Sequence, residues 1–182
     1  SDEMCKRLLH HEGLYYPLGL GPHGLVSEAL LLHMKSPAIH GALNMIYRYG
    51  ITEDEAYAQK VYPYLRGVAD FWEKDLVYRD GVYHVVGDGM HERTDGNIRD
   101  NGVPENPVNT LGYLKTFFTW MPRISEALDL DEKKREKWLE IAENLAPYPK
   151  GTIREIQENP TLWKEVDVKL EDLLPEEMLD KE

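Results

Sequence analysis

The chain has 182 residues, enough for a domain with a hydrophobic core, and its 42% hydrophobic and 30% charged residues are ordinary for a globular protein. The formal net charge of −12 argues against nucleic acid or an anionic membrane as a general partner, because phosphates repel an acidic surface. A single cysteine, Cys5, excludes an intrachain disulfide, and no apolar run approaches the ~18 residues of a membrane span.

The first predicted helix follows an irregular stretch. Residues 13–24 contain too many Gly and Pro residues for a helix or a strand. Ser36 and Pro37 then form an N-cap and N1 pair, a common start of a helix, and Gly50 is expected to end it. Apolar residues recur between them at helical spacing: Ile39, Leu43, Ile46 and Tyr47.

A capping box predicts the start of a second helix. Thr52 and Glu55 have the spacing at which each side chain can bond the backbone N–H of the other. The helical pattern continues to about Leu76, and Pro63 inside it is expected to kink or restart the helix, because proline has no N–H to donate. One apolar stripe runs along this helix: Val61, Leu65, Val68 and Trp72.

The next elements are a β-hairpin and two further helices. Residues 77–83 predict the hairpin, because β-forming Val and Tyr residues flank the turn sequence Arg79-Asp80-Gly81. Asn106-Pro107 predicts the start of a helix that continues to about Leu128. Another helix is expected over 131–145. The inward-facing residues of these two helices are Leu111, Leu114, Phe118, Met121, Trp138, Ile141 and Leu145.

Helices dominate this pattern, so we predict an all-α, mainly helical fold of helical hairpins with one small β-hairpin. After Gly151 the helical signal weakens to short amphipathic pieces, and the acidic end beyond Pro175 is expected to fray. We therefore predict a helical domain over residues 1–150, followed by short amphipathic segments and an acidic tail over 151–182. The apolar residues of these segments are Leu162, Trp163, Val166, Leu170, Leu173 and Leu174.

The segment from Asp88 to Leu111, DGMHERTDGNIRDNGVPENPVNTL, is the most informative part of the sequence. It is rich in Gly, Asn and Asp and carries two carboxylates, Glu92 and Glu105, between the hairpin and a helix start. Long ordered loops on a rigid scaffold often hold ligands and catalytic groups. A solvated linker has a similar composition, so both interpretations stay open at this point.

Several kinds of chemistry lack their sequence signal. The chain has no P-loop, no nucleophile elbow and no calcium loop, and its seven His residues are scattered without the spacing of a zinc site. We therefore expect no cofactor and no metal. Carboxylate chemistry remains, and glycosidic bonds are cleaved by a pair of carboxyl groups.

The two candidate carboxylates also have ordinary structural explanations. Glu92 lies between His91 and Arg93, so it could be a tuned acid or a surface residue in an ion pair. Glu105 precedes a helix, where its charge suits the helix dipole, and Asn106 and Asn109 could cap that helix.

The order of the elements resembles the catalytic domain of the six-hairpin glycosidases, in particular the inverting α-L-fucosidase type of glycoside hydrolase family ninety-five. The resemblance covers roughly residues 14–150 and lies in a pattern over the whole stretch, without an invariant signature. The matching features are Tyr49 to Asp54, Tyr62-Pro63, Ala69 to Trp72, the hairpin Val77 to Val85, His91-Glu92, and the stretches ENPVNTLGYLKTFF and LDEKKREKWLEIAENLAPYP.

The resemblance implies an (α/α)6 toroid with an oligosaccharide or glycoside substrate in a cleft at one end of the inner helices. It implies that Glu92 is the general acid; Glu105 is our second candidate for a catalytic residue. The residues expected to line the cleft are Asp88, His91, Asn106, Asn109, Trp72 and His23.

The chain departs from the family in its length. A toroid of about twelve helices needs some 350 residues at ~1.5 Å of rise per residue, so we expect about half a toroid, with the second catalytic carboxylate outside this chain. Such a piece could be inactive alone, and its exposed apolar helix faces would favour a homo-oligomer. The alternative function is a non-catalytic helical module that binds glycans or a protein partner. The sequence leaves the cellular compartment open.

Overall fold

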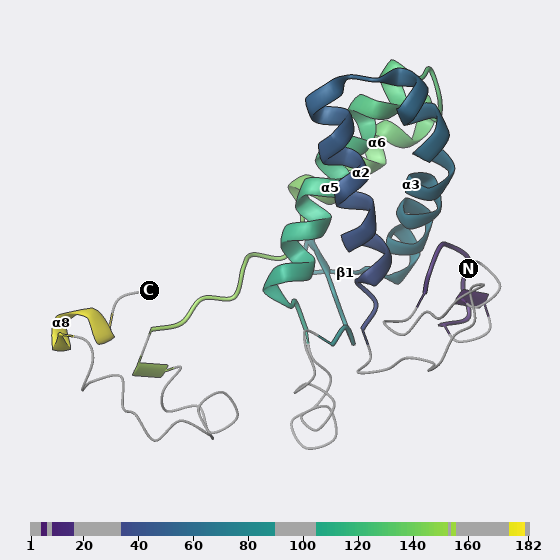
Figure 1. Cartoon of the computed structure of the whole chain (residues 1–182). Helices are drawn as coiled ribbons and strands as arrows, with labels where there is room; N and C mark the ends of the chain where they lie inside the picture. The colour runs from purple at the N-terminus through teal and green to yellow at the C-terminus, as the bar shows by residue number, and fades with distance from the viewer. Residues whose placement is uncertain are drawn as a thin grey trace. The chain divides into compact units, whose positions relative to one another are not determined.

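A computed structural model describes residues 5–6, 9–16, 34–89, 105–152, 154–155 and 175–180 (Figure 1). The chain divides into two compact units, Ser1–Pro147 and Tyr148–Glu182. The described part is mainly helical with one two-stranded antiparallel sheet, which confirms the predicted all-α class. Among the described residues, no helix combines the length and the apolar character needed to cross a membrane. The described elements are α2 (Pro37–Thr52), α3 (Glu55–Asp75), β1 (Val77–Arg79), β2 (Val82–His84), α5 (Val108–Ala127), the 3-10 helix η3 (Glu132–Lys134), α6 (Arg135–Glu143) and, in the second unit, α8 (Glu176–Leu179).

The first unit contains two helical hairpins that pack on each other. Helix α2 packs on α3, α5 packs on α6, and α2 also lies against α5 (Figure 1). The rings of His40 and Tyr113 stack at 5.4 Å near the starts of α2 and α5, and Gly50 approaches Trp120 further along both helices. Helices α2 and α5 therefore run parallel, as the first helices of two successive hairpins do.

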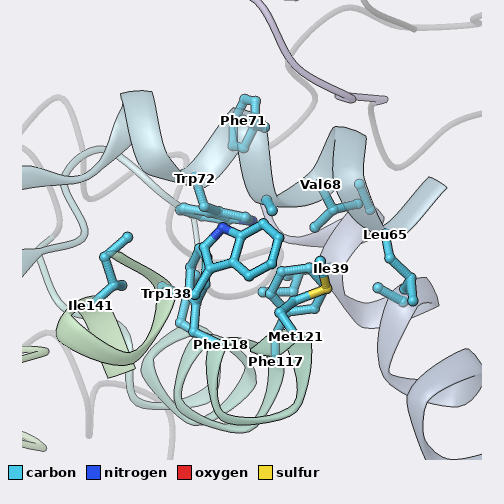
Figure 2. Close-up of a cluster of buried hydrophobic side chains, with 14 of the residues drawn as sticks. Ile39, Leu65, Val68, Phe71, Trp72, Phe117, Phe118, Met121, Trp138 and Ile141 are labelled. Atoms are coloured by element: carbon cyan, nitrogen blue, oxygen red, sulfur yellow. The ribbon is translucent and has the colours of Figure 1, made fainter. Parts of the chain in front are cut away.

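A cluster of large apolar side chains lies between α2, α3, α5 and α6 (Figure 2). The predicted stripes of α3 and α5 supply most of it, and Trp138 and Ile141 of α6 complete it. Burying such side chains stabilises each by roughly 1.5–3 kcal/mol relative to exposure, so this cluster is the main source of stability in the unit. The labelled members are Ile39, Leu65, Val68, Phe71, Trp72, Phe117, Phe118, Met121, Trp138 and Ile141.

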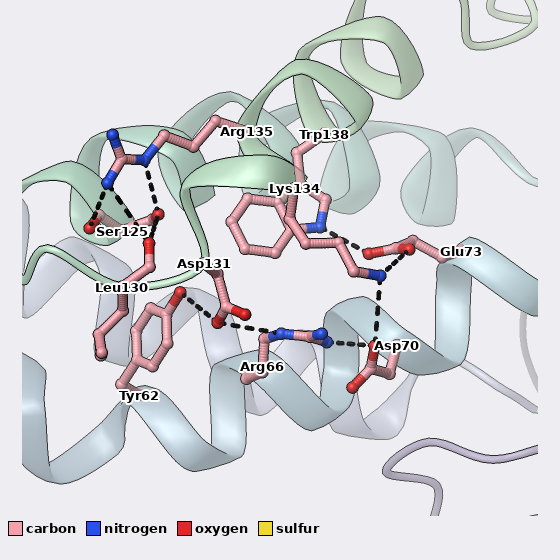
Figure 3. Close-up of polar contacts among 10 residues, drawn as sticks. All are labelled: Tyr62, Arg66, Asp70, Glu73, Ser125, Leu130, Asp131, Lys134, Arg135 and Trp138. Carbon is pink, nitrogen blue, oxygen red and sulfur yellow. Dashed lines mark hydrogen bonds and ion pairs between the residues drawn. The ribbon is translucent and has the colours of Figure 1, made fainter.

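A polar network ties α3 to the turn between α5 and α6 (Figure 3). Asp131 lies at the predicted helix start as the N-cap of η3, but it is left-handed at φ 47° and its side chain does not cap the helix. Its carboxylate instead accepts hydrogen bonds from the Tyr62 hydroxyl at 2.9 Å and Arg66 Nε at 3.1 Å. Burial and the Asp131 hydrogen bond raise the pKa of Tyr62, which keeps the hydroxyl as the donor. Glu73 extends the network by accepting from the Trp138 indole at 2.7 Å.

The boundary between α2 and α3 differs from the sequence prediction. Helix α2 continues past Gly50 to Thr52, and the N-cap of α3 is Asp54, whose side chain accepts from the Tyr57 N–H at 3.0 Å. The Thr52 hydroxyl bonds back to the Arg48 carbonyl, so the predicted capping box does not form. A Cβ at Gly50 would lie 2.9 Å from the Trp120 ring, so this glycine serves a close helix contact rather than a helix end.

Two further expectations about the helices concern Pro63 and the end of α6. Pro63 lies inside α3 without ending it, and it is exposed, so water can bond the carbonyl that proline leaves free. Helix α6 ends at Glu143, before the predicted Leu145. After α6 the chain pairs with β2. The Tyr83 N–H donates to the Asn144 carbonyl at 2.7 Å, and the Ala146 N–H donates to the Tyr83 carbonyl at 2.9 Å.

The predicted β-hairpin is confirmed. Strands β1 and β2 pair antiparallel with Arg79 opposite Val82, so Asp80 and Gly81 form a two-residue loop. Both loop residues have positive φ, 52° and 84°, as the tight turn of a two-residue hairpin requires.

Gly13 fixes the N-terminal segment against α3. Its φ is +132°, and a Cβ would lie 2.4 Å from the Phe71 Cα, while the next residue bonds the Gly67 carbonyl at 2.8 Å. We expect Gly13→Ala to lower the free energy of unfolding by about 2 kcal/mol, measured by urea denaturation. Gly81→Ala is the matched control, because Gly81 also has positive φ but faces open space. Equal losses in the two variants would show that the contact with α3 contributes nothing.

Candidate functional site

Both ends of the Asp88–Leu111 segment are fixed to the same scaffold. Val86 and Glu105 form an antiparallel bridge, and the Asn106 N–H donates to the Val85 carbonyl at 2.8 Å. The Asn106 carboxamide oxygen also accepts from the Val85 N–H at 3.0 Å. The described residues before and after 90–104 are therefore neighbours beside the hairpin. Three predicted site residues, His23, His91 and Glu92, lie outside the described residues.

Asp88 is a buried carboxylate at the start of this loop. It is fully buried, and it accepts hydrogen bonds from the Lys35 N–H and from the Thr110 hydroxyl, each at 2.6 Å. Burial raises the pKa of Asp88, although its two hydrogen bonds act in the opposite direction. Because Thr110 lies in the first turn of α5, Asp88 connects Lys35, two residues before α2, to the start of α5.

The raised pKa of Asp88 makes the stability of the fold depend on pH. The native state binds more protons than the unfolded chain between the ordinary Asp pKa and the raised one, so stability falls as pH rises through that window. Asp88→Asn should remove this fall, because the amide does not titrate. Urea unfolding at several pH values between about 3.5 and 7 measures this change in the free energy of unfolding. Parallel stability curves for the two proteins would contradict the prediction.

A second buried carboxylate, Asp75, lies beside Lys35 at the end of α3. Lys35 Nζ is 2.9 Å from both carboxylate oxygens of Asp75 and donates to the Val86 carbonyl at 3.0 Å. His11 Nε2 is 3.4 Å from the same carboxylate, and Cys5 Sγ is 3.6 Å from His11 Nδ1. Lys35 thus holds Asp88 with its backbone and Asp75 with its side chain, and it joins the two carboxylates into one buried polar cluster.

The sequence analysis missed Asp75, Lys35, Thr110 and His11 as members of this cluster. Lys35 is 40 residues from Asp75 and 53 from Asp88 in the chain, so no local motif connects them. Charged residues are seldom buried without a partner, and a single sequence shows the residue but not its burial.

The structure gives Glu105 a structural role. Arg79 of β1 donates to both carboxylate oxygens of Glu105, with Nη1 at 3.1 Å from Oε1. The Arg79 hydrogen bond lowers the pKa of Glu105, whereas a general acid needs a raised pKa. Glu105, the second candidate for the general acid, is therefore disfavoured as a proton donor.

Two other predicted cleft residues have different surroundings. Asn106 does not cap the helix: the N-cap position belongs to Pro107, and the Asn106 amide nitrogen lies 3.0 Å from His84 Nδ1. Asn109 has a buried carboxamide oxygen that accepts no hydrogen bond from the described residues. Asn106 thus holds the chain near Glu105 against Val85, whereas the Asn109 carboxamide oxygen is a buried polar atom rather than an acceptor on an open surface.

Trp72 was expected to line the cleft, and this expectation is wrong. The side chain is 0% exposed and packs edge-on against Phe71 inside the hydrophobic cluster (Figure 2). Its position in the apolar stripe of α3 already indicated a core residue.

The described residues contain no group of three or more His, Cys, Asp or Glu side chains arranged to hold a metal ion. No protein-family model matches the chain, and no curated protein matches it either.

Proposed function

We propose that this chain supplies the proton-donating side of a glycoside hydrolase site. The observation that carries the proposal is that the residues on either side of 90–104, the stretch that contains Glu92, are fixed to the helical scaffold: Val86 pairs with Glu105, and the buried carboxylate of Asp88 bonds Thr110. Catalytic groups on loops need such anchoring, because a small displacement of a proton donor costs much of its rate effect.

The arrangement of the helices also supports the proposal. Two successive hairpins, α2 with α3 and α5 with α6, place α2 and α5 side by side and parallel. Repetition of such hairpins builds helical toroids and solenoids, in which the first helices form an inner layer. Asp88, which precedes residues 90–104, bonds Lys35 and Thr110, so it lies at the end of the array where α2 and α5 begin.

In the proposed reaction, the Glu92 carboxyl group donates its proton to the leaving oxygen of the glycosidic bond. A second carboxylate, contributed from outside this chain, activates water on the opposite face of the sugar, and the reaction inverts the anomeric centre. His91, Asn109 and His23 remain proposed substrate contacts. Asp88 and Asn106 hold the loop, because their polar atoms already bond the scaffold.

The test is hydrolysis by the full-length protein. We expect oligosaccharides or aryl glycosides to release a reducing sugar whose first-formed anomer, followed by NMR, is inverted. Binding without any release would favour the alternative of a non-catalytic glycan-binding module. A retained anomer would overturn the inverting mechanism, and the absence of both binding and release would overturn the proposal.

A further inference from the structure

A pocket of about 340 Å³ opens at the far end of the first unit from Asp88. It lies where α2 ends and α3 begins, along the second half of α5. Thr110, which holds Asp88, and Trp120 of the pocket are separated along α5 by about 15 Å at ~1.5 Å per residue. The pocket is therefore separate from the anchored loop. Its lining residues are Tyr49, Gly50, Glu53, Glu55, Trp120 and Arg123.

The indole ring of Trp120 lines the pocket, and Gly50 leaves room for this ring beside α2. A Cβ at Gly50 would lie 2.9 Å from Trp120 Cη2 and 3.2 Å from Cζ2, closer than side chains approach. The absence of a side chain at Gly50 thus lets the ring lie against α2. Trp120 is partly exposed, in contrast to Trp72 and Trp138, which are 0% exposed in the core.

Charged groups of both signs surround this ring. Glu53 and Glu55 form no ion pair with another described residue, and the guanidinium of Arg123 lies 5.2 Å from the Trp120 ring centroid. Glu53, Glu55 and Tyr49 line the pocket together, and burial and the charges of Glu55 and Glu53 raise the pKa of Tyr49. The pocket therefore offers hydrogen-bond acceptors and a donor beside an aromatic surface.

We infer that this pocket binds a neutral pyranose ring, through contact with Trp120 and hydrogen bonds to Glu53, Glu55 and Arg123. A hydroxyl group both donates and accepts, so vicinal sugar hydroxyls can bond carboxylates and a guanidinium together. The apolar face of a pyranose can lie on an indole. The two glutamates disfavour an anionic ligand, whereas Arg123 opposes a cationic ligand only in part, so the test includes tetramethylammonium as a cationic probe.

The size of the pocket limits the ligand. Small-molecule sites span roughly 300–1,000 Å³, so a pocket at the lower end suits one sugar ring better than an extended oligosaccharide. Sugar binding in this pocket does not require hydrolysis by Glu92, so it can be tested independently of the proposed function.

The test uses the indole N–H signals of the 15N-labelled full chain. The Trp120 signal is assigned from its loss in Trp120→Phe, and the probes are methyl β-D-glucopyranoside, methyl β-D-galactopyranoside, methyl α-D-mannopyranoside and methyl α-L-fucopyranoside. We expect at least one glycoside to shift the Trp120 signal saturably, with Kd of about 1 mM, while the Trp72 and Trp138 signals stay in place. A second probe pair, tetramethylammonium and inorganic phosphate, should leave the Trp120 signal unchanged.

Substitutions in the pocket test whether the shift of the Trp120 signal comes from binding there. Gly50→Ala pushes the ring with its new methyl group, and we expect it to raise Kd about tenfold. Glu55→Gln removes one charged acceptor without touching the backbone, and an increase of about threefold is expected. Glu132→Gln is the matched control, because Glu132 is exposed on η3 and outside the pocket. If no glycoside shifts the Trp120 signal, or if tetramethylammonium or phosphate shifts it instead, the proposal is overturned.

Discussion

Glu92→Gln is expected to lower kcat/KM for glycosides with poor leaving groups by about 10²–10⁴-fold, the usual contribution of a general acid. The amide keeps the size and polarity of the side chain but has no acidic proton to donate. A leaving group that departs as a stable anion needs no protonation, so the loss should shrink toward activated aryl glycosides. The measurement is a series of aryl glycosides of increasing leaving-group pKa, assayed with the full-length protein.

Glu105→Gln is the matched control for this experiment. Glu105 lies at the other end of the same loop, but its carboxylate is exposed and bonded to Arg79, and its pKa is lowered. We expect this variant to keep nearly full activity. An unchanged rate in Glu92→Gln would remove Glu92 from the mechanism, and an equal loss for every leaving group would assign it a role other than proton donation.

The helices and the hairpin were predictable because their signals are local. Helical spacing of apolar residues in α3 and α5, and the Asp80-Gly81 turn, act within a few residues of the chain. The helix ends were predicted less well, because tertiary contacts decide them. Gly50 was expected to end a helix, but it sits inside α2 to admit the ring of Trp120, a residue 70 positions away in the printed sequence.

The candidate site was predictable only in part for the same reason. Composition identified the segment from Asp88 to Leu111, and the resemblance added Asp88 as a cleft residue; the structure shows Asp88 buried and bonded to Thr110. Nothing local predicts that Lys35 and Asp75 lie beside it, since each is an ordinary charged residue in its own neighbourhood. Trp72 shows the opposite error: an analogy placed it in a cleft, although its helical spacing favoured the core.

Asp75→Ala is expected to be the most destabilising of the single substitutions in the polar cluster. The Asp75 and Lys35 side chains are only 7% and 14% exposed, so removal of the carboxylate leaves a buried ammonium group whose remaining described bond is to the Val86 carbonyl. Breaking a buried ion pair in this way costs about 3–5 kcal/mol of unfolding free energy. Urea denaturation monitored by far-UV circular dichroism measures the loss.

The double variant Lys35→Met with Asp75→Leu separates the charge from the packing. Replacement of both partners by apolar side chains leaves no buried charge, so we expect it to recover most of the stability that Asp75→Ala loses. Glu12→Ala is the matched control: Glu12 pairs with Lys74 at 3.1 Å, but this pair is exposed and its loss should change little. If Asp75→Ala and Glu12→Ala had equally small effects, the Lys35–Asp75 pair would be open to water, and the cluster could not hold the loop as described.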